Sequence, residues 1–362
     1  MASEESERRF AAFAEQVESS SARDRWLVLT HDNPDPDALA STAALGLILR
    51  RRFRRKVTLA YGGMIGRAEN REMVRSLKLE LSHLRHLNRR NYQRFALVDA
   101  QPWTGNSQLP KGVLPDLVVD HHPIRKATLA SRFFDIRPDY GATATILTEY
   151  LRWSRIQPTR ALATALVYAI RSETQEFGRE AAGHDHAAYD ALLPRIDKRL
   201  LSRIQNARVP LAYFRDLHRA LENLSGVENF VVTHLGEVDQ PDIVPEIADL
   251  LLRLEGKTWS LATGTHGDRV YASIRTTNPN ADAGNLMRRL VGRHGKGGGH
   301  GTMAGGWVHL EDSAGENAGA VERLLAQRLA RALKKNPDRL QPLGLAPESD
   351  IDLEPVAAAA AD

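Results

Sequence analysis

The chain has 362 residues, which is too long for one ordinary hydrophobic core, so we expect two domains. Its 49 Lys and Arg residues against 45 Asp and Glu residues give a net charge of +4. This balance is consistent with an anionic substrate but far from the charge of a protein that coats nucleic acid. The sequence contains no cysteine, which excludes disulfides, thiolate metal sites and a cysteine nucleophile. Any metal chemistry must therefore use histidines and carboxylates.

No stretch of the sequence indicates export or membrane insertion. Residues 1–20 are charged and amphipathic, without the apolar segment of a signal peptide. No apolar run approaches the length of a membrane span. We therefore expect a soluble, cytoplasmic protein that does not bind membranes.

Strands alternate with helices in the first half of the chain. A surface helix within residues 1–24 is followed by expected strands at residues 26–30, 57–61, 95–98 and 117–119. Helical periodicity indicates helices at residues 38–52, 67–77, 141–155 and 159–170. This alternation predicts an α/β fold with a doubly wound parallel sheet.

The second half begins with a polar, helical stretch at residues 184–224, broken by Pro194 and Pro210, which predicts a connector. A smaller α/β unit follows, with expected strands at residues 230–234, 258–263, 270–274 and 306–310 and helices at residues 243–254, 281–291 and 316–333. Beyond residue 336 the sequence has no pattern and predicts disorder. We expect a cleft between the two domains.

Residues able to bind a metal follow four of the apolar segments. In chain order they are His31, Asp35 and Asp37, then Asp99, then Asp120, His121 and His122, and finally Glu173. The carboxyl ends of neighbouring parallel strands converge on one crevice. The sequence therefore predicts one site that is assembled from distant parts of the chain.

The composition of this set indicates the chemistry. Histidines with several carboxylates suit Mn²⁺, Mg²⁺ or another divalent ion, and there are enough ligands for about two ions. Such a pair activates water and stabilises the attacking and leaving oxygens at phosphorus. Each motif alone has an ordinary interpretation as well: a turn for Asp-Pro-Asp, a helix cap for Asp99 and a surface position for the histidine pair.

In the order HDNPDPDA, VDA, VDHHP and SETQ, these motifs resemble those of the DHH phosphoesterases, a family named for the triplet seen here as Asp120-His121-His122. Ser273-Ile274-Arg275 and the segment GGGHGTMAGG resemble the family's associated C-terminal domain. The resemblance covers residues 25–311. It implies a catalytic domain over residues 1–195, a helical connector over 196–225, a substrate-binding domain over 226–340 and a disordered tail over 341–362.

The resemblance also implies roles for individual residues. His31 and Asp35 would bind one metal ion, Asp37 and His121 the other, and Asp99 would bridge them. His122 would face the scissile phosphate, and Asp120 would orient a histidine. Glu173 stands where the family has Asp. Glutamate keeps a hard oxygen ligand but is one methylene longer, which leaves the preferred ion and the rate open, with Mn²⁺ expected and Mg²⁺ or Co²⁺ as alternatives.

Residues 292–306 contain eight glycines in fifteen positions, and we expect them to form a loop. Glycines let backbone N–H groups approach a phosphate or base closely, so Gly297, Gly298, Gly299 and His300 are expected to bind substrate. Arg275 could clamp a terminal phosphate with two hydrogen bonds. A flexible loop without a ligand is the alternative.

These features favour a two-metal phosphodiesterase or exonuclease that hydrolyses short single-stranded RNA or DNA, like the family's oligoribonuclease ("nanoRNase"), which also removes the 3′-phosphate of pAp. Within the same class, the alternatives are a cyclic- or linear-dinucleotide phosphodiesterase and an inorganic pyrophosphatase. From a different class, the chain could be a catalytically impaired nucleotide-binding regulator with Glu173 as the lesion. The family resemblance also implies a possible homodimer.

Overall fold

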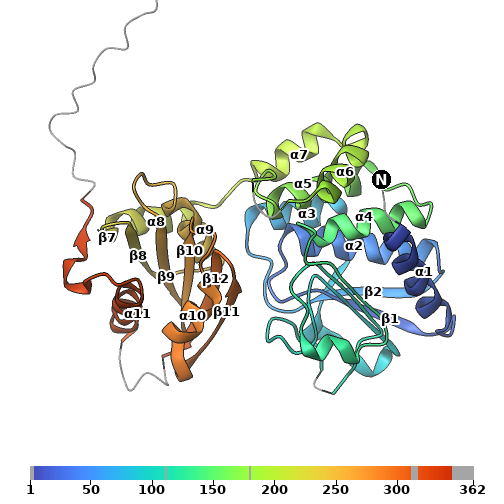
Figure 1. Cartoon of the computed structure of the whole chain (residues 1–362), viewed down its shortest axis with the longest axis horizontal. Coiled ribbons are helices and arrows are strands. Elements are labelled where there is room, and N and C mark those ends of the chain that lie inside the picture. Colours follow the sequence, from blue (N-terminus) through green and yellow to red (C-terminus); the bar gives the residue numbers. More distant parts are fainter. Residues whose placement is uncertain (1–3, 111, 179–180, 311–316, 345–362) are drawn as a thin grey trace, which may run out of the picture. The chain divides into compact units, whose positions relative to one another are not determined.

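The computed structural model describes residues 4–110, 112–178, 181–310 and 317–344 (Figure 1). The chain divides into two compact units, Met1–Arg208 and Val209–Asp362. Each unit is built on a sheet of its own, as predicted. Among the residues described, none of the helices combines the length and apolar composition that crossing a membrane requires.

The first unit contains six parallel strands in the order β3-β2-β1-β4-β5-β6. They are β1 (Arg25–Leu29), β2 (Lys56–Tyr61), β3 (Leu81–His83), β4 (Arg94–Val98), β5 (Leu117–Asp120) and β6 (Phe134–Ile136). The strand order reverses direction between β1 and β4, and ligands bind beyond the carboxyl ends of strands at such a point. The predicted parallel sheet is confirmed. Strands β3 and β6 were not predicted because three residues are too few to show a periodicity.

The helices of the first unit pack together on one face of the sheet. They are α1 (Glu4–Glu18), α2 (Pro36–Arg51), α3 (Ala68–Leu77), α4 (Thr143–Trp153), α5 (Arg160–Glu173), α6 (Gly183–Leu192) and α7 (Lys198–Gln205). Trp26 and Val28 of β1 are buried against this layer. Leu27 and Leu29 face the other side, where loop residues such as Leu109 cover the sheet. Burial on both faces explains the continuous apolar runs of the strands.

A buried ion network connects β6 to the helices. Arg137, which follows β6 and is 4% exposed, donates from Nη2 to Asp135 Oδ2 at 2.7 Å and from Nη1 to Glu149 Oε2 at 2.6 Å. The Tyr150 hydroxyl and Arg9 of α1 also donate to Asp135. A buried carboxylate that loses its cation is strongly destabilising. Arg137 therefore fixes the edge strand to α1 and α4.

The second unit contains a seven-stranded sheet in the order β11-β12-β10-β9-β8-β7-β13, in which only β8 and β9 are parallel. The strands are β7 (Ser225–Val227), β8 (Phe230–Glu237), β9 (Trp259–His266), β10 (Arg269–Thr276), β11 (Gly295–His300), β12 (Met303–His309) and β13 (Gln341–Pro342). The helices are α8 (Leu211–Glu222), α9 (Ile243–Leu251), α10 (Ala283–Val291) and α11 (Ala318–Ala332). Helices α10 and α11 bury one face, and α8 and α9 bury part of the other.

The loop expected at residues 292–306 is instead largely a β-hairpin, in which β11 pairs with β12 from Gly295–Val308 to His300–Met303. Packing explains part of the glycine content. A Cβ on Gly297 would lie 2.8 Å from Met287 Cγ of α10, and one on Gly295 would lie 2.0 Å from the Trp307 carbonyl oxygen. Glycine therefore allows a helix and a second strand to approach β11 closely.

Two predicted boundaries also differ from the structure. Residues 196–225 do not form a separate connector: Leu200 and Ile204 of α7 are in the core of the first unit, and Ala220 of α8 is in the core of the second. An amphipathic helix gains stability by burying its apolar face, so each helix joins the nearest core. Of the tail predicted at 341–362, β13 pairs with β7, and residues 345–362 lie outside the described part.

Replacing Arg137 by Met should lower the free energy of unfolding of the first unit by about 3–5 kcal/mol, because the buried Glu149 loses its cation and the buried Asp135 keeps only Arg9. Urea unfolding followed by circular dichroism measures this loss. Arg132→Met is the matched control, since the Arg132 side chain is 63% exposed beside Asp116 and such pairs contribute about 0–1 kcal/mol. Equal, small losses in both variants would show that the network is dispensable.

Candidate metal centre

The loop after β1 places His31 and Asp35 side by side. Asp35 caps α2, with Oδ1 accepting from the Ala38 N–H at 2.9 Å, and Pro36 begins the helix. The other oxygen, Oδ2, lies 3.6 Å from His31 Nε2. Because His31 Nδ1 is 2.7 Å from the Asp32 carbonyl oxygen, Nε2 is the ring nitrogen that faces the acids. The stiff loop predicted from the two prolines thus holds both side chains.

Glycines at the end of β2 make room for this loop. A Cβ on Gly62 would lie 1.8 Å from Asp32 Oδ1, and one on Gly63 would lie 2.2 Å from Asn33 Oδ1. The same Asn33 oxygen accepts from the Met64 N–H at 2.6 Å. Gly63 and Asn33 both have positive φ, 49° and 56°, which these residue types tolerate best.

Asp99 follows β4 directly and stands between three histidines. Its N–H bonds to the Val119 carbonyl oxygen at 2.9 Å, which continues the pairing with β5. Its carboxylate is 2% exposed, with Oδ2 3.5 Å from His31 Nε2. The other oxygen, Oδ1, lies 3.8 Å from both His121 Nε2 and His122 Nδ1. The Asp99 carboxylate therefore lies close to candidate metal ligands that follow β1 and β5.

These distances define two groups that share Asp99. In each group, one ligand atom from every residue lies within 4.8 Å of the others; the groups are His31, Asp35 and Asp99, and Asp99, His121 and His122. His121 gives the clearest indication of a missing partner. Its Nδ1 is 3.1 Å from the Tyr140 carbonyl oxygen, whereas its buried Nε2 has no hydrogen-bond partner among the residues that the structure describes. A buried polar atom without a partner needs an explanation, and a divalent cation fits this donor set.

Asp120, the last residue of β5, orients His122. Its Oδ1 lies 2.8 Å from His122 Nδ1, and its Oδ2 accepts from Gln101 Nε2 at 2.7 Å. Burial would lower the pKa of His122, but the hydrogen bond and charge of Asp120, together with Asp99 and Glu173, raise that pKa to about 10. Burial would raise the pKa of Asp120, but His122 lowers it below its usual range. The His122 side chain is 34% exposed, against 9% for His121, so it is the more open to a substrate.

Asp37 lies beside the two groups without belonging to either. Its oxygens accept from the N–H groups of Thr143 and Ala144 at the start of α4, both at 2.7 Å. Burial and then repulsion from Asp99 raise the pKa of Asp37 well above its usual value. In this structure, α4 therefore binds the carboxylate that the family resemblance assigns to a metal, and that assignment stays a prediction.

Glu173 is the last residue of α5 and acts electrostatically on the site. Its charge contributes to the raised pKa of both Asp37 and His122. After Thr174, three successive residues have positive φ: Gln175 at 47°, Glu176 at 58° and Phe177 at 65°. Each such residue costs about 1–2 kcal/mol. The Glu176 carboxylate accepts two hydrogen bonds from Arg171 at 2.7 Å, which holds the strained turn next to Glu173.

Three residues that the sequence reading did not identify support the site. Thr143 Oγ1 donates to Asp99 Oδ1 at 2.9 Å, the Tyr140 carbonyl oxygen orients His121, and Gln101 holds Asp120. Of these three residues, only Gln101 could have been identified from the sequence, because it lies two residues after the candidate ligand Asp99. Thr143 and Tyr140 lie more than 40 residues after Asp99, and only the fold brings them to it.

The remaining predicted binding residues lie in the second unit. Arg275 of β10 is 8% exposed and already bound by protein groups: Nε donates to Asp249 Oδ1 at 2.6 Å, and Nη1 donates to Ser273 Oγ at 2.7 Å. Gly297, Gly298, Gly299 and His300 belong to β11. The side chain of His300 is outside the described part of the structure.

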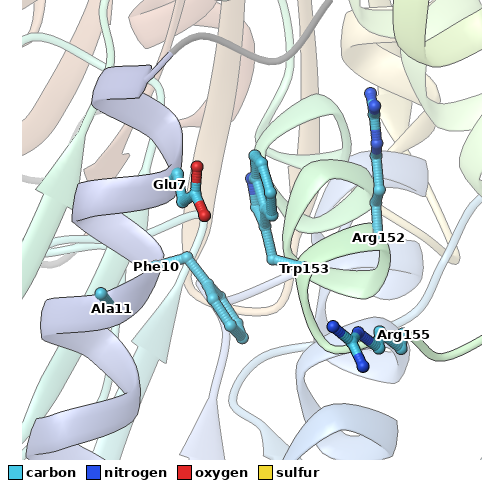
Figure 2. A pocket seen from close by; sticks show the side chains of 6 residues that line it. All are labelled: Glu7, Phe10, Ala11, Arg152, Trp153 and Arg155. Carbon is cyan, nitrogen blue, oxygen red and sulfur yellow. The ribbon is translucent and has the colours of Figure 1, made fainter.

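A surface pocket of about 400 Å³ is separate from these groups. It is lined by Glu7, Phe10 and Ala11 of α1 and by Arg152, Trp153 and Arg155 at the far end of α4. Figure 2 shows the Trp153 ring between α1 and the two arginines. The metal centre uses the opposite, N-terminal end of α4. Because α4 is 11 residues long, the two sites are roughly 15 Å apart along the helix.

Replacing Thr143 by Val removes the hydroxyl that binds Asp99 but keeps the shape of the side chain. We expect the affinity for Mn²⁺ to fall about tenfold to a hundredfold, because the Asp99 carboxylate shared by the two groups is no longer oriented. Isothermal titration calorimetry of the metal-free protein measures this change. Thr148→Val in the same helix is the control, since its hydroxyl donates only to the Ala144 carbonyl oxygen. Unchanged affinity in Thr143→Val would exclude this role for the hydroxyl.

In the metal-free protein, His122 should titrate near pH 10. Its folded pKa lies above the ordinary value of about 6.5, so the stabilisation is complete below about pH 6.5 and is lost as pH rises through about 10. Replacing Asp120 by Asn should return the pKa of His122 toward about 6.5. NMR titration of the imidazole tests this, with the exposed Asp190→Asn as control. A pKa that stays near 10 would assign the effect to Asp99 and Glu173 instead.

Family models match both halves of the chain. Residues 25–170 match the model of the DHH family N-terminal domain, and residues 228–332 match the DHHA1 domain. An uncharacterized protein of Methanocaldococcus jannaschii is 37% identical over 287 residues, which are 78% of this chain and 58% of that protein. The chain thus spans less than two thirds of this relative.

Solved structures are similar as well. An exopolyphosphatase-related protein from Bacteroides fragilis aligns with a TM-score of 0.70 and 15% identity over 91% of this chain and 98% of its own, which shows the same fold. A pGpG-specific phosphodiesterase from Vibrio cholerae aligns over 86% of this chain and 99% of its own at 13% identity, with a TM-score of only 0.31. The chain belongs to the DHH family and carries a DHHA1 domain as well.

Proposed function

We propose that the protein is a two-metal phosphodiesterase that hydrolyses short single-stranded oligonucleotides, of the nanoRNase type, and that it also removes the 3′-phosphate of pAp. The observation that carries this proposal is the position of Asp99, whose two oxygens face separate groups of ligands. A shared carboxylate between two sets of imidazoles is what a pair of neighbouring cations requires. The family match supports the reaction class.

The residues have distinct roles in this proposal. His31 and Asp35 would hold one ion, His121 the other, and Asp99 both. When bound, the two ions would activate water and stabilise charge on the phosphate oxygens. Imidazoles in both groups favour Mn²⁺, with Co²⁺ or Mg²⁺ as alternatives, because imidazole suits transition metals better than Mg²⁺. Glu173 adds negative charge that favours cations nearby.

We assign to His122 the role of interacting directly with the substrate. It is partly exposed, and in the metal-free protein Asp120 is the main cause that raises its pKa to about 10. A charged imidazole beside the ligands can stabilise a phosphate oxygen or give a proton to the leaving oxygen. Asp120 acts only through His122, since both its oxygens are bound by protein groups.

The predicted clamp residue Arg275 does not support pyrophosphate as the substrate. Pyrophosphate is small and highly charged, so its binding needs several converging cations. In the second unit, Arg275 is paired with Asp249 and 8% exposed, so its charge is largely neutralised. A phosphodiester carries one negative charge per phosphate, so its binding needs fewer cations.

A catalytically impaired regulator is the second candidate, because Glu173 replaces the family's aspartate. The charge of Glu173 still acts on Asp37 and His122, which supports an active site. Glu173→Asp distinguishes the two. For an enzyme adapted to glutamate, we expect unchanged or reduced turnover, whereas a large gain in turnover would identify Glu173 as a lesion.

Turnover should be measured with a 5′-labelled RNA dinucleotide, a 5-mer, a 24-mer, pAp and pyrophosphate. With Mn²⁺ we expect rapid cleavage of the dinucleotide and 5-mer, weaker release of phosphate from pAp, and little action on the 24-mer or pyrophosphate. Excess chelator should abolish all activity. His122→Ala should lower kcat by about 10²–10⁴-fold while Mn²⁺ affinity falls far less, because the residue acts on the substrate.

One control variant and one contrary outcome complete this test. His186→Ala removes an exposed histidine that stacks on Phe177 outside the two ligand groups, and it should keep wild-type turnover. Fast hydrolysis of pyrophosphate with no cleavage of oligonucleotides would overturn the proposal in favour of a pyrophosphatase.

A further inference from the structure

One face of the second sheet carries an aromatic side chain among cations. In the antiparallel register, Trp307 of β12 lies opposite Tyr271 of β10 on one side and Lys296 of β11 on the other. Directly opposed residues point to the same face of a sheet. The alternate residues, such as Ala304 and Val308, point to the other face and are buried against α10 and α11.

The covering helices leave this part of the face open. Helix α9 packs over β9, where a Cβ on Gly264 would lie 3.0 Å from Val244 Cγ2 and where Ser260 Oγ donates to the Ala248 carbonyl oxygen at 2.7 Å. Tyr271 packs at the margin of this apolar cluster. Within the described residues, Trp307 is in neither apolar cluster of the second unit and is partly exposed. Core packing therefore does not account for its indole.

Two cations flank the indole. The guanidinium carbon of Arg269 lies 4.4 Å from the centre of the Trp307 ring, and Lys296 Nζ lies 5.9 Å from it. His309 meets the ring edge-on at 4.7 Å, and Asp268 pairs with both His309 and Arg269. An indole with neighbouring cations offers stacking and charge to a ligand that is both aromatic and anionic.

Packing against the residues that the structure describes does not account for two glycines near Trp307. Gly298 and Gly305 are paired directly opposite each other, two residues along the strands from Lys296 and Trp307. A Cβ on Gly298 would meet nothing within 4 Å, and one on Gly305 would meet only the Ala272 carbonyl oxygen at 3.9 Å. By contrast, a Cβ on Gly299 would lie 2.2 Å from the Met303 carbonyl oxygen. These two positions therefore form bare, open backbone beside the ring.

We propose that Trp307, Arg269 and Lys296 form a stacking platform for one nucleobase of the substrate, with the bare backbone at Gly298 and Gly305 giving room for the attached sugar-phosphate. This inference rests on the proposed function and refines it. An inorganic polyphosphate has no ring to stack, so the platform selects nucleotides over polyphosphates. The alternative is a cation–π contact that only stabilises the sheet edge, which would act on every substrate alike.

The test uses the full chain with Mn²⁺ and three substrates: a 5′-phosphorylated adenine RNA dinucleotide, the same molecule with abasic residues, and inorganic tripolyphosphate. Trp307→Leu should raise KM for the dinucleotide about tenfold, with kcat within about twofold, because stacking on the indole is lost. KM for the abasic dinucleotide should not change. Trp307→Phe, which keeps a ring, should retain most of the affinity. An equal rise in KM for the abasic dinucleotide would overturn the platform.

Binding without turnover gives a second readout if Trp307→Leu does not fold. AMP should quench the tryptophan fluorescence of the wild type and of Trp153→Phe, and should not quench that of Trp307→Phe. Quenching that persists in Trp307→Phe would contradict the platform. If the wild type hydrolyses none of the three substrates but AMP still quenches Trp307, the proposed reaction fails while the nucleobase platform stands. Hydrolysis of tripolyphosphate alone would overturn both.

Discussion

The first unit depends on one buried carboxylate at the reversal point of its sheet. Asp99 is 2% exposed and faces histidines from the loop after β1 and from the end of β5. The parallel order β1-β4-β5 makes this possible, because adjacent strands end at the same edge. The positive φ of Asp99 and the hydroxyl of Thr143 then fix where its two oxygens point.

Burying several carboxylates close together destabilises the folded protein, and hydrogen bonds from neighbouring groups offset this repulsion. Asp37 is stabilised by two N–H groups at the start of α4, where the helix dipole is positive. Asp120 is stabilised by His122 and Gln101. In the described part of the chain, the buried Nε2 of His121 beside Asp99 has no hydrogen-bond partner. Cations bound beside Asp99 would complete the balance, which explains why the ligands can be assembled in advance.

The second unit shows how one sequence feature can serve two purposes. Glycines at positions such as 295, 297 and 299 are required by the close approach of α10 and β12. Gly298 and Gly305 meet no such constraint and lie beside a cationic indole. The same glycine-rich segment therefore builds a hairpin and leaves part of its surface bare. The glycine content alone does not show which glycines are required by close packing and which leave the backbone open. Both situations need a residue without a side chain.

The sequence by itself determined the parallel sheet, the two units and the candidate ligands of the site. Apolar runs that end in His31, Asp99 and Asp120 indicate strand ends, and strand ends of a parallel sheet converge. Only the tertiary structure decided how those ligands divide around Asp99, which hydrogen bonds orient His121 and His122, and that α4 binds Asp37. It also decided that the glycine segment is a hairpin, because its pairing depends on distant contacts with α10. The local sequence pattern shows which residues follow a strand. The orientation of their side chains depends on partners such as Tyr140 and Thr143, which the fold brings to the site from distant parts of the chain.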